Sequence, residues 1–241
     1  VTSFQPQYSP DGKEVAFLED RSTIRVINLA TKQVRTVMDG KYEYSYSDGD
    51  QWYQWSPDSR WILTNYIGTG GWNNKDVALV NASGNGEIHN LTQSGYNDSG
   101  AKWVLDGKAM IWESDRAGYR SHGSWGAHGD IYIMFFDLEA YERFLLTKEE
   151  LALVEEAEKD KKEDKKEEAD KKGKKDAKKA DDKKKDEVKP LTFDLENCRD
   201  RIVRLTQHSS SLGDAVLSKK GDKLYYQASF ESGSDLWCHD L

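Results

Sequence analysis

The segment from Ser121 to Asp130, with the sequence SHGSWGAHGD, holds the residues most suited to chemistry. Ser124 lies two residues from His122, and a serine beside a histidine is the minimum for a nucleophile with its general base. The segment lacks the G-x-S-x-G pattern, and its surroundings do not predict the strand, sharp turn and helix that expose a catalytic serine. We therefore expect no catalytic residue in this chain.

Metal binding is the other chemistry that this segment suggests. His122, His128 and Asp130 carry ligand atoms, but their spacing matches no helical or knuckle pattern of a zinc site. Cys198 and Cys238 are the two cysteines, and they are too far apart in the chain to predict a disulfide framework or a zinc site. We expect no metal, no cofactor and two unpaired thiols.

Aromatic residues on glycine-rich segments are the stronger signal. The chain has 8 Trp and 12 Tyr, and such side chains combine a large contact area with a polar group. We expect them to bind peptides, although they could instead pack the loops onto the ends of the strands. The candidate contact residues are Tyr44, Trp72, Tyr96, Tyr119, His122 and Trp125.

Charge excludes one class of partner. The formal net charge is −8, and residues 159–187 form a run with 14 Lys and 11 Asp or Glu. The rest of the chain holds 21 basic and 32 acidic residues, which argues against a nucleic-acid binder because such proteins need a basic stripe. No stretch reaches the roughly 18–20 apolar residues of a membrane span, and the first residues, VTSFQPQYSPDGK, resemble the structured repeat rather than a signal peptide.

The elements that must position these residues form a repeat. Three segments, PQYSPDGKEVAFLED, YQWSPDSRWILTNY and AKWVLDGKAMIWESD, place Asp11, Asp58 and Asp106 at spacings of 47 and 48 residues. A fourth and weaker copy, DAVLSKKGDKLYYQAS, begins at Asp214, and its departure at LSKKGDK leaves its turn geometry open. A period of about 40–50 residues is typical of a four-stranded propeller blade. We predict an all-β fold, a β-propeller arc of about four four-stranded blades over residues 4–38, 51–92, 100–206 and 213–241.

The charged run is predicted to be an insertion in this arc. The third repeat is 66 residues longer than the period, and the excess, about residues 140–190, falls between its third and fourth strands. Thr147 and Glu150 form a capping-box pattern that predicts a helix start. Beyond Lys159 no apolar stripe remains, so a solvated helix or disorder is expected there.

Strand order assigns the loops to two faces. In each blade, strands a to d form an antiparallel meander, so the a–b turns and c–d loops share one face and the b–c and d–a connections share the other. The charged run belongs to the first face and the aromatic candidates to the second. The chain begins at a strand a and ends at a strand c, so we expect part of a six- or seven-bladed ring that self-associates when isolated.

The strings YSPDGKEVAF, WSPDSRWIL and DIYIMFFDL followed by RIVRLT resemble the repeat of TolB-type and tricorn-type propellers. SDRAGYRSHGSWGAHGDIYIMFFDLEAYERFLLTKEE with the following Lys/Glu-rich run resembles the propeller region of bacterial tricorn-protease homologues. The resemblance implies a periplasmic serine peptidase in which further blades, a PDZ module and a protease core of the C-terminal-processing type belong to the same parent chain. It implies that the propeller filters or guides peptides or unfolded polypeptide, with a homo-oligomer possible, and it carries no catalytic residue onto this chain.

Two other functions fit the same repeat. One is a free-standing TolB-like scaffold that binds envelope proteins in the periplasm. The other is the propeller of a prolyl-oligopeptidase-type enzyme. A cytoplasmic location is the alternative to the periplasm.

Overall fold

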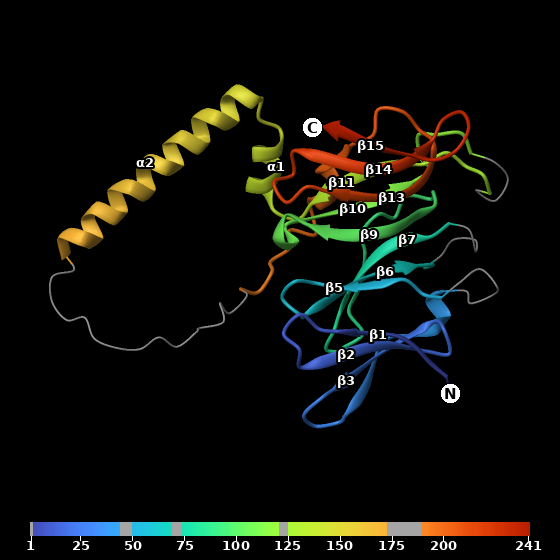
Figure 1. The fold of residues 1–241 in the computed structure, drawn as a ribbon. Coiled ribbons are helices and arrows are strands. Elements are labelled where there is room, and N and C mark those ends of the chain that lie inside the picture. Colours follow the sequence, from blue (N-terminus) through green and yellow to red (C-terminus); the bar gives the residue numbers. More distant parts are fainter. Residues whose placement is uncertain (1, 44–49, 69–73, 121–124, 173–188) are drawn as a thin grey trace. The chain divides into compact units, whose positions relative to one another are not determined.

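The computed structural model describes residues 2–43, 50–68, 74–120, 125–172 and 189–241 (Figure 1). The chain divides into two compact units. One unit comprises Val1–Leu138 and Lys189–Leu241, and the other comprises Glu139–Val188.

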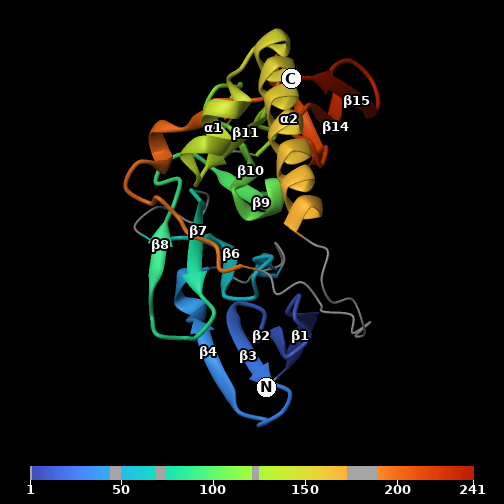
Figure 2. The ribbon, with the colours of Figure 1, turned by 90° about the vertical axis from the view of Figure 1, so that its left-hand side faces the viewer.

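The first unit consists of four antiparallel sheets, each a meander in sequence order, and this confirms the predicted arc of all-β blades (Figure 2). Blade 1 holds β1 (Ser3–Tyr8), β2 (Glu14–Glu19), β3 (Thr23–Asn28) and β4 (Val34–Met38). Blade 2 holds β5 (Tyr53–Trp55), β6 (Trp61–Tyr66), β7 (Asp76–Asn81) and β8 (Ile88–Asn90). Blade 3 holds β9 (Asp98–Val104), β10 (Ala109–Ser114), β11 (Asp130–Phe135) and β12 (Ile202–Arg204). Blade 4 holds β13 (Ser211–Leu217), β14 (Lys223–Ser229) and β15 (Asp235–Asp240).

Serine and aspartate close the a–b turns that defined the repeat. In blade 1, Ser9 Oγ donates to Asp11 Oδ1 at 2.6 Å and accepts from the backbone N–H of Glu14 at 3.0 Å. The fourth blade also closes its turn with a serine and an aspartate, although the aspartate stands two positions later: Ser218 Oγ donates to Asp222 Oδ1 at 2.6 Å and accepts from the Lys223 N–H at 3.2 Å. The third blade is the one that differs: Leu105–Gly107 form a 3-10 turn there.

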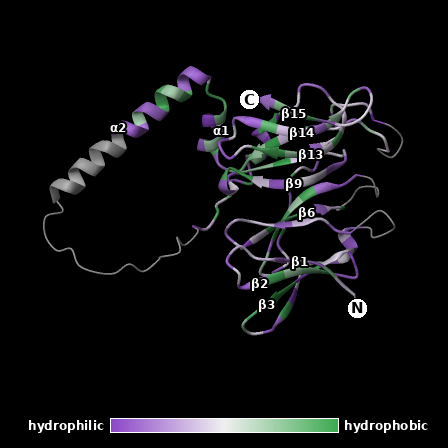
Figure 3. Cartoon of the chain, in the orientation of Figure 1, coloured by the Kyte–Doolittle hydropathy of each residue, from purple (hydrophilic) through white to green (hydrophobic). Residues whose placement is uncertain are grey.

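Apolar side chains fill the space between neighbouring blades. Leu18 and Ile24 of blade 1 pack with Tyr53 and Ile62 of blade 2 in one cluster. A second cluster joins blade 2 to blade 3 and includes Trp112, a fully buried indole. Because interior blades bury both faces of their sheets, their strands carry the apolar residues visible in Figure 3.

An Asp–Thr pair joins strands c and d in blades 2 and 3, and both of its residues are buried in blade 3. Asp130 begins β11, and Thr206 follows β12 directly opposite it in the strand register. Thr206 Oγ1 donates to Asp130 Oδ1 at 2.6 Å and accepts from the backbone N–H of Ile131 at 3.2 Å. Asp76 and Thr92 repeat the arrangement in blade 2, with an oxygen–oxygen distance of 3.3 Å. The "L-T" that ends each of these repeats therefore closes the outer strand of its blade.

The segment that leads into β12 packs against blades 2 and 3, a feature that the sequence does not predict. The Phe193 ring lies 5.4 Å from Trp61 of blade 2 and 5.1 Å from Phe136 after β11, measured between ring centroids. The Leu191 backbone N–H donates to Asp58 Oδ2 at 2.8 Å. This return segment, residues 189–201, thereby joins two blades through the face of the a–b turns.

The second unit is helical. α1 (Leu138–Phe144) precedes α2 (Lys148–Lys172), and Arg143 joins them through ion pairs to Glu155 at 3.6 Å and Glu158 at 2.8 Å. The predicted capping box is present, because Thr147 N–H donates to Glu150 Oε2 at 2.9 Å and Thr147 Oγ1 accepts from the Glu150 N–H at 3.3 Å. α1 was not predicted. Within the described part of the chain, neither helix is long and apolar enough to cross a membrane.

Candidate binding surface

The b–c and d–a connections of blades 1 to 3 gather at one end of their sheets, which is the right-hand side of Figure 1. We call the described part of the connections around blades 2 and 3 the loop face; it comprises residues 74–75, 91–97, 115–120, 125–129 and 205–210. Three of the six candidate contact residues, Tyr96, Tyr119 and Trp125, lie on this face.

Tyr119 and Trp125 project into solvent. Each is 65 % exposed, so most of the surface of each ring faces solvent. The base of their loop is nevertheless held, because the His128 N–H donates to the Tyr119 carbonyl at 2.8 Å. The His128 ring stands edge-on to Tyr119, with 6.0 Å between centroids. The loop thus presents two exposed aromatic rings from a hydrogen-bonded base.

Arg120 connects this loop to its neighbours. Its guanidinium lies 5.1 Å from the centroid of the Tyr96 ring, in cation–π geometry, and its Nη2 donates to Asn74 Oδ1 at 3.0 Å. Arg120 Nε also forms an ion pair with Asp115 at 3.3 Å. Three separate connections therefore converge on one side chain. The sequence offered only a weak signal for Arg120, a charged residue beside an aromatic residue in a glycine-containing loop.

The carboxylates beneath the loop face form hydrogen bonds and ion pairs within the protein. Asp98 and Asp130 are both fully buried. Asp98 accepts from Arg116 Nη2 at 3.2 and 3.1 Å and from Ser94 Oγ at 2.5 Å. Asp130 accepts from Arg204 Nη2 at 2.7 Å and from Ser209 Oγ at 2.7 Å, besides Thr206. Both aspartates already have cationic partners, so Asp130 is a fixed part of the blade.

The remaining candidates lie outside the described residues. Tyr44, Trp72 and His122 belong to this group, as does Ser124 of the rejected nucleophile pair. Their participation in the loop face stays a prediction.

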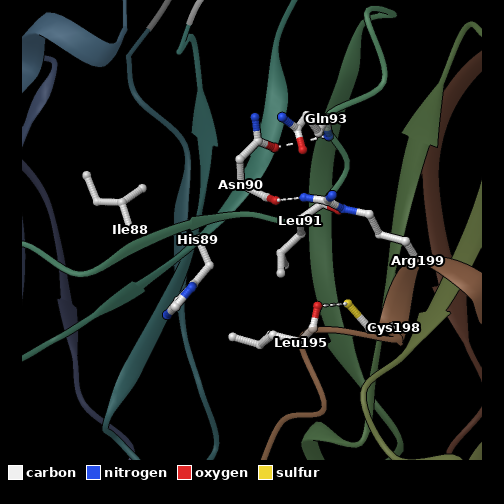
Figure 4. Close-up of a pocket in the computed structure, with 8 residues that line it drawn as sticks. All are labelled: Ile88, His89, Asn90, Leu91, Gln93, Leu195, Cys198 and Arg199. Atoms are coloured by element: carbon white, nitrogen blue, oxygen red, sulfur yellow. Dashed lines mark hydrogen bonds between the residues drawn. The ribbon is translucent and has the colours of Figure 1, made fainter.

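A separate hollow of about 320 Å³ lies at the outer edge of blade 2, between β8 and the return segment (Figure 4). Arg199 occupies the strand edge there, since its Nη2 donates to the Asn90 carbonyl at 2.8 Å and its Nε to the Leu91 carbonyl at 3.2 Å. Cys198 lines the hollow, but burial raises the pKa of its thiol, which disfavours the thiolate needed for nucleophilic chemistry. The hollow is a capped strand edge without an activated nucleophile.

Comparison with solved structures identifies the architecture. The chain is similar to TolB from Acinetobacter baumannii, with a TM-score of 0.52 and 18 % identity over 99 % of this chain and 41 % of that one. It is also similar to the tricorn protease, with a TM-score of 0.59 and 12 % identity over 99 % of this chain and 21 % of that one. The fold is that of a TolB- and tricorn-type β-propeller region. This propeller region spans less than half the length of either protein. Its sequence matches no protein-family model and no curated protein.

Proposed function

We propose that this propeller region binds extended peptide segments on the loop face and passes them to a serine peptidase core of the C-terminal-processing type in the same polypeptide, in the periplasm. The region itself contributes binding and no catalytic group. The exposure of Tyr119 and Trp125 carries the proposal, because aromatic rings held on anchored loops supply contact area at a low entropic cost.

Electrostatics support a peptide rather than a strongly charged ligand. The charged groups at the loop face are largely engaged with one another: Arg120 with Asp115, Arg116 with Asp98, and Lys75 with Glu43 at 3.3 Å. Recognition by exposed rings and by the backbone of the loops tolerates many side chains. That breadth suits a protein that handles unfolded polypeptide of varied sequence.

The test is the binding of a fluorescently labelled, unfolded casein-type polypeptide, measured by anisotropy. Tyr119→Ala and Trp125→Ala should each weaken binding by about 1 kcal/mol or more, as expected for aromatic anchors. Tyr8→Ala is the matched control, because Tyr8 is 70 % exposed but ends β1 on the opposite face. Equal affinity for all three variants and the parent would refute the proposal. The same assay should show no cleavage of the polypeptide by this region alone.

A further inference from the structure

A cavity of about 130 Å³ lies where the first strands of blades 2, 3 and 4 meet. Its walls come from β9, β10 and β11 of blade 3, from β13 of blade 4, and from Trp52 just before β5. A single buried water needs about 10–15 Å³ by a comparable measure, so the space admits a small chemical group. The cavity shares no lining residue with the loop face or with the hollow at β8.

One face of the blade 3 sheet gives the cavity its chemistry. Lys102 pairs with Ile111, and Glu113 pairs with Ile131, so these four side chains leave the sheet on the same side. The two isoleucines form an apolar wall, and the carboxylate and the ammonium lie at its margins. An apolar wall with a charged group at one end is suited to a ligand that is itself amphipathic.

The two charged groups differ in whether they have partners. Lys102 Nζ binds Asp214 across the gap between blades 3 and 4 and donates to the Ala215 carbonyl at 2.9 Å. Among the described residues, Glu113 has no hydrogen bond or ion pair through its side chain. The cavity is therefore lined by the Glu113 carboxylate without a counter-ion, because Lys102, the cation in its lining, already pairs with Asp214.

The blade architecture does not require this carboxylate. In each of blades 2, 3 and 4, strand c begins with an aspartate that pairs with a residue of strand b. The residue just before that partner is Glu113 in blade 3, Asn65 in blade 2 and Gln227 in blade 4. Amides of similar shape fill the position in both neighbours. Glu113 thus adds a charge to blade 3 at a position that is neutral in blades 2 and 4.

The surroundings of Glu113 make its negative charge costly. Burial, Asp115 and Asp130 raise the pKa of Glu113 to about 7. The charged groups packed around it are Lys102 on β9, Asp115 and Asp130 at the ends of β10 and β11, and Asp214 on β13. Each of these three aspartates has an ion-pair partner, whereas Glu113 has none among the described residues. A cationic ligand would complete the missing ion pair.

We propose that this cavity is a binding site for an alkylammonium group, such as a lysine side chain of a bound peptide, with Glu113 as its counter-ion and Ile111 and Ile131 packing on its methylenes. The identification of the ligand as part of a peptide rests on the proposed function. The site itself can be examined without a peptide.

The probe is n-butylammonium, with 1-butanol as the neutral analogue, titrated into the protein while the indole N–H resonance of Trp52 is followed by NMR. We expect saturable shifts with n-butylammonium and at least about tenfold weaker binding of 1-butanol, the loss expected for a charge-assisted hydrogen bond. Glu113→Gln should weaken n-butylammonium binding by about the same factor. Binding to the parent should strengthen from pH 6 to pH 8 as Glu113 loses its proton.

Glu231→Gln, the same change at an exposed residue between β14 and β15, is the control and should bind like the parent. The proposal is overturned if n-butylammonium does not bind, if the alcohol binds equally well, or if Glu113→Gln leaves the affinity unchanged. Intact casein binding with no n-butylammonium site would overturn this inference alone. An n-butylammonium site with no polypeptide binding would overturn the proposed function alone.

Discussion

At the scale of single residues, the loop face and the cavity depend on side chains whose role cannot be inferred from the residues next to them in the sequence. The sequence named Tyr96, Tyr119 and Trp125 as contacts but could not separate binding from packing, because both uses favour aromatic residues in loops. The 65 % exposure of Tyr119 and Trp125 favours binding, and their contact with a peptide stays a prediction. Glu113 looked like one acid among many. The strand register shows that Glu113 differs from its equivalents in the other blades, because Asn65 and Gln227 occupy the same position there.

The half-buried Glu113 predicts a pH dependence of folding. The folded-state pKa of Glu113, about 7, exceeds the unfolded value of 4.5, so the folded state holds its proton more tightly and loses stability as pH rises from about 4.5 through 7. Glu113→Gln should therefore raise the free energy of unfolding by about 2–3 kcal/mol at pH 8, and by less than about 1 kcal/mol near pH 5. Urea denaturation of both proteins at the two pH values measures this. A pH-independent difference, or none at pH 8, would contradict it.

At the scale of elements, the strands were predictable because several copies of one sequence pattern indicate the same set of strands. Alignment of Asp11, Asp58 and Asp106 recovered the meander even where alternation was weak. The return segment escaped prediction because Leu191 and Phe193 stand in a stretch with no period, and their partners are far away in the chain. α1 was missed because the string DIYIMFFDL, which runs through Leu138, was interpreted as one strand, although Asp137 stands at a helix N-cap position.

The Asp–Thr pair yields a prediction at this scale. Thr206→Val keeps the shape of the side chain but removes its hydroxyl, so the Asp130 carboxylate and the Ile131 N–H each lose a buried hydrogen bond. We expect a loss of about 1–3 kcal/mol in the free energy of unfolding. Thr192→Val, at an exposed position of the return segment, should change it by under about 0.5 kcal/mol. Equal effects of the two variants in urea denaturation would show that the pair does not stabilise the blade.

At the scale of the whole molecule, the insertion and the return segment should contribute unequally to stability. Deletion of residues 158–187 with a short Gly/Ser join should leave the thermal midpoint within a few degrees, because the run is almost entirely charged and loop closure depends weakly on length. Phe193→Ala should instead cost about 2–4 kcal/mol, since it removes an aromatic contact with both blade 2 and blade 3. Calorimetry of the two variants tests the contrast. A large drop on deletion would show that the charged run packs on the protein.

The insertion also separates two paired strands in time. Sixty-six residues lie between the end of β11 and the start of β12. At a synthesis rate of about 5–20 residues per second, β12 leaves the ribosome about 3–13 s after β11. Throughout that interval the outer edge of β11 has no fourth strand and can accept a strand from another chain. The residues synthesised in those seconds are mostly charged. We expect their charge to oppose aggregation of the nascent chain until β12 pairs with β11.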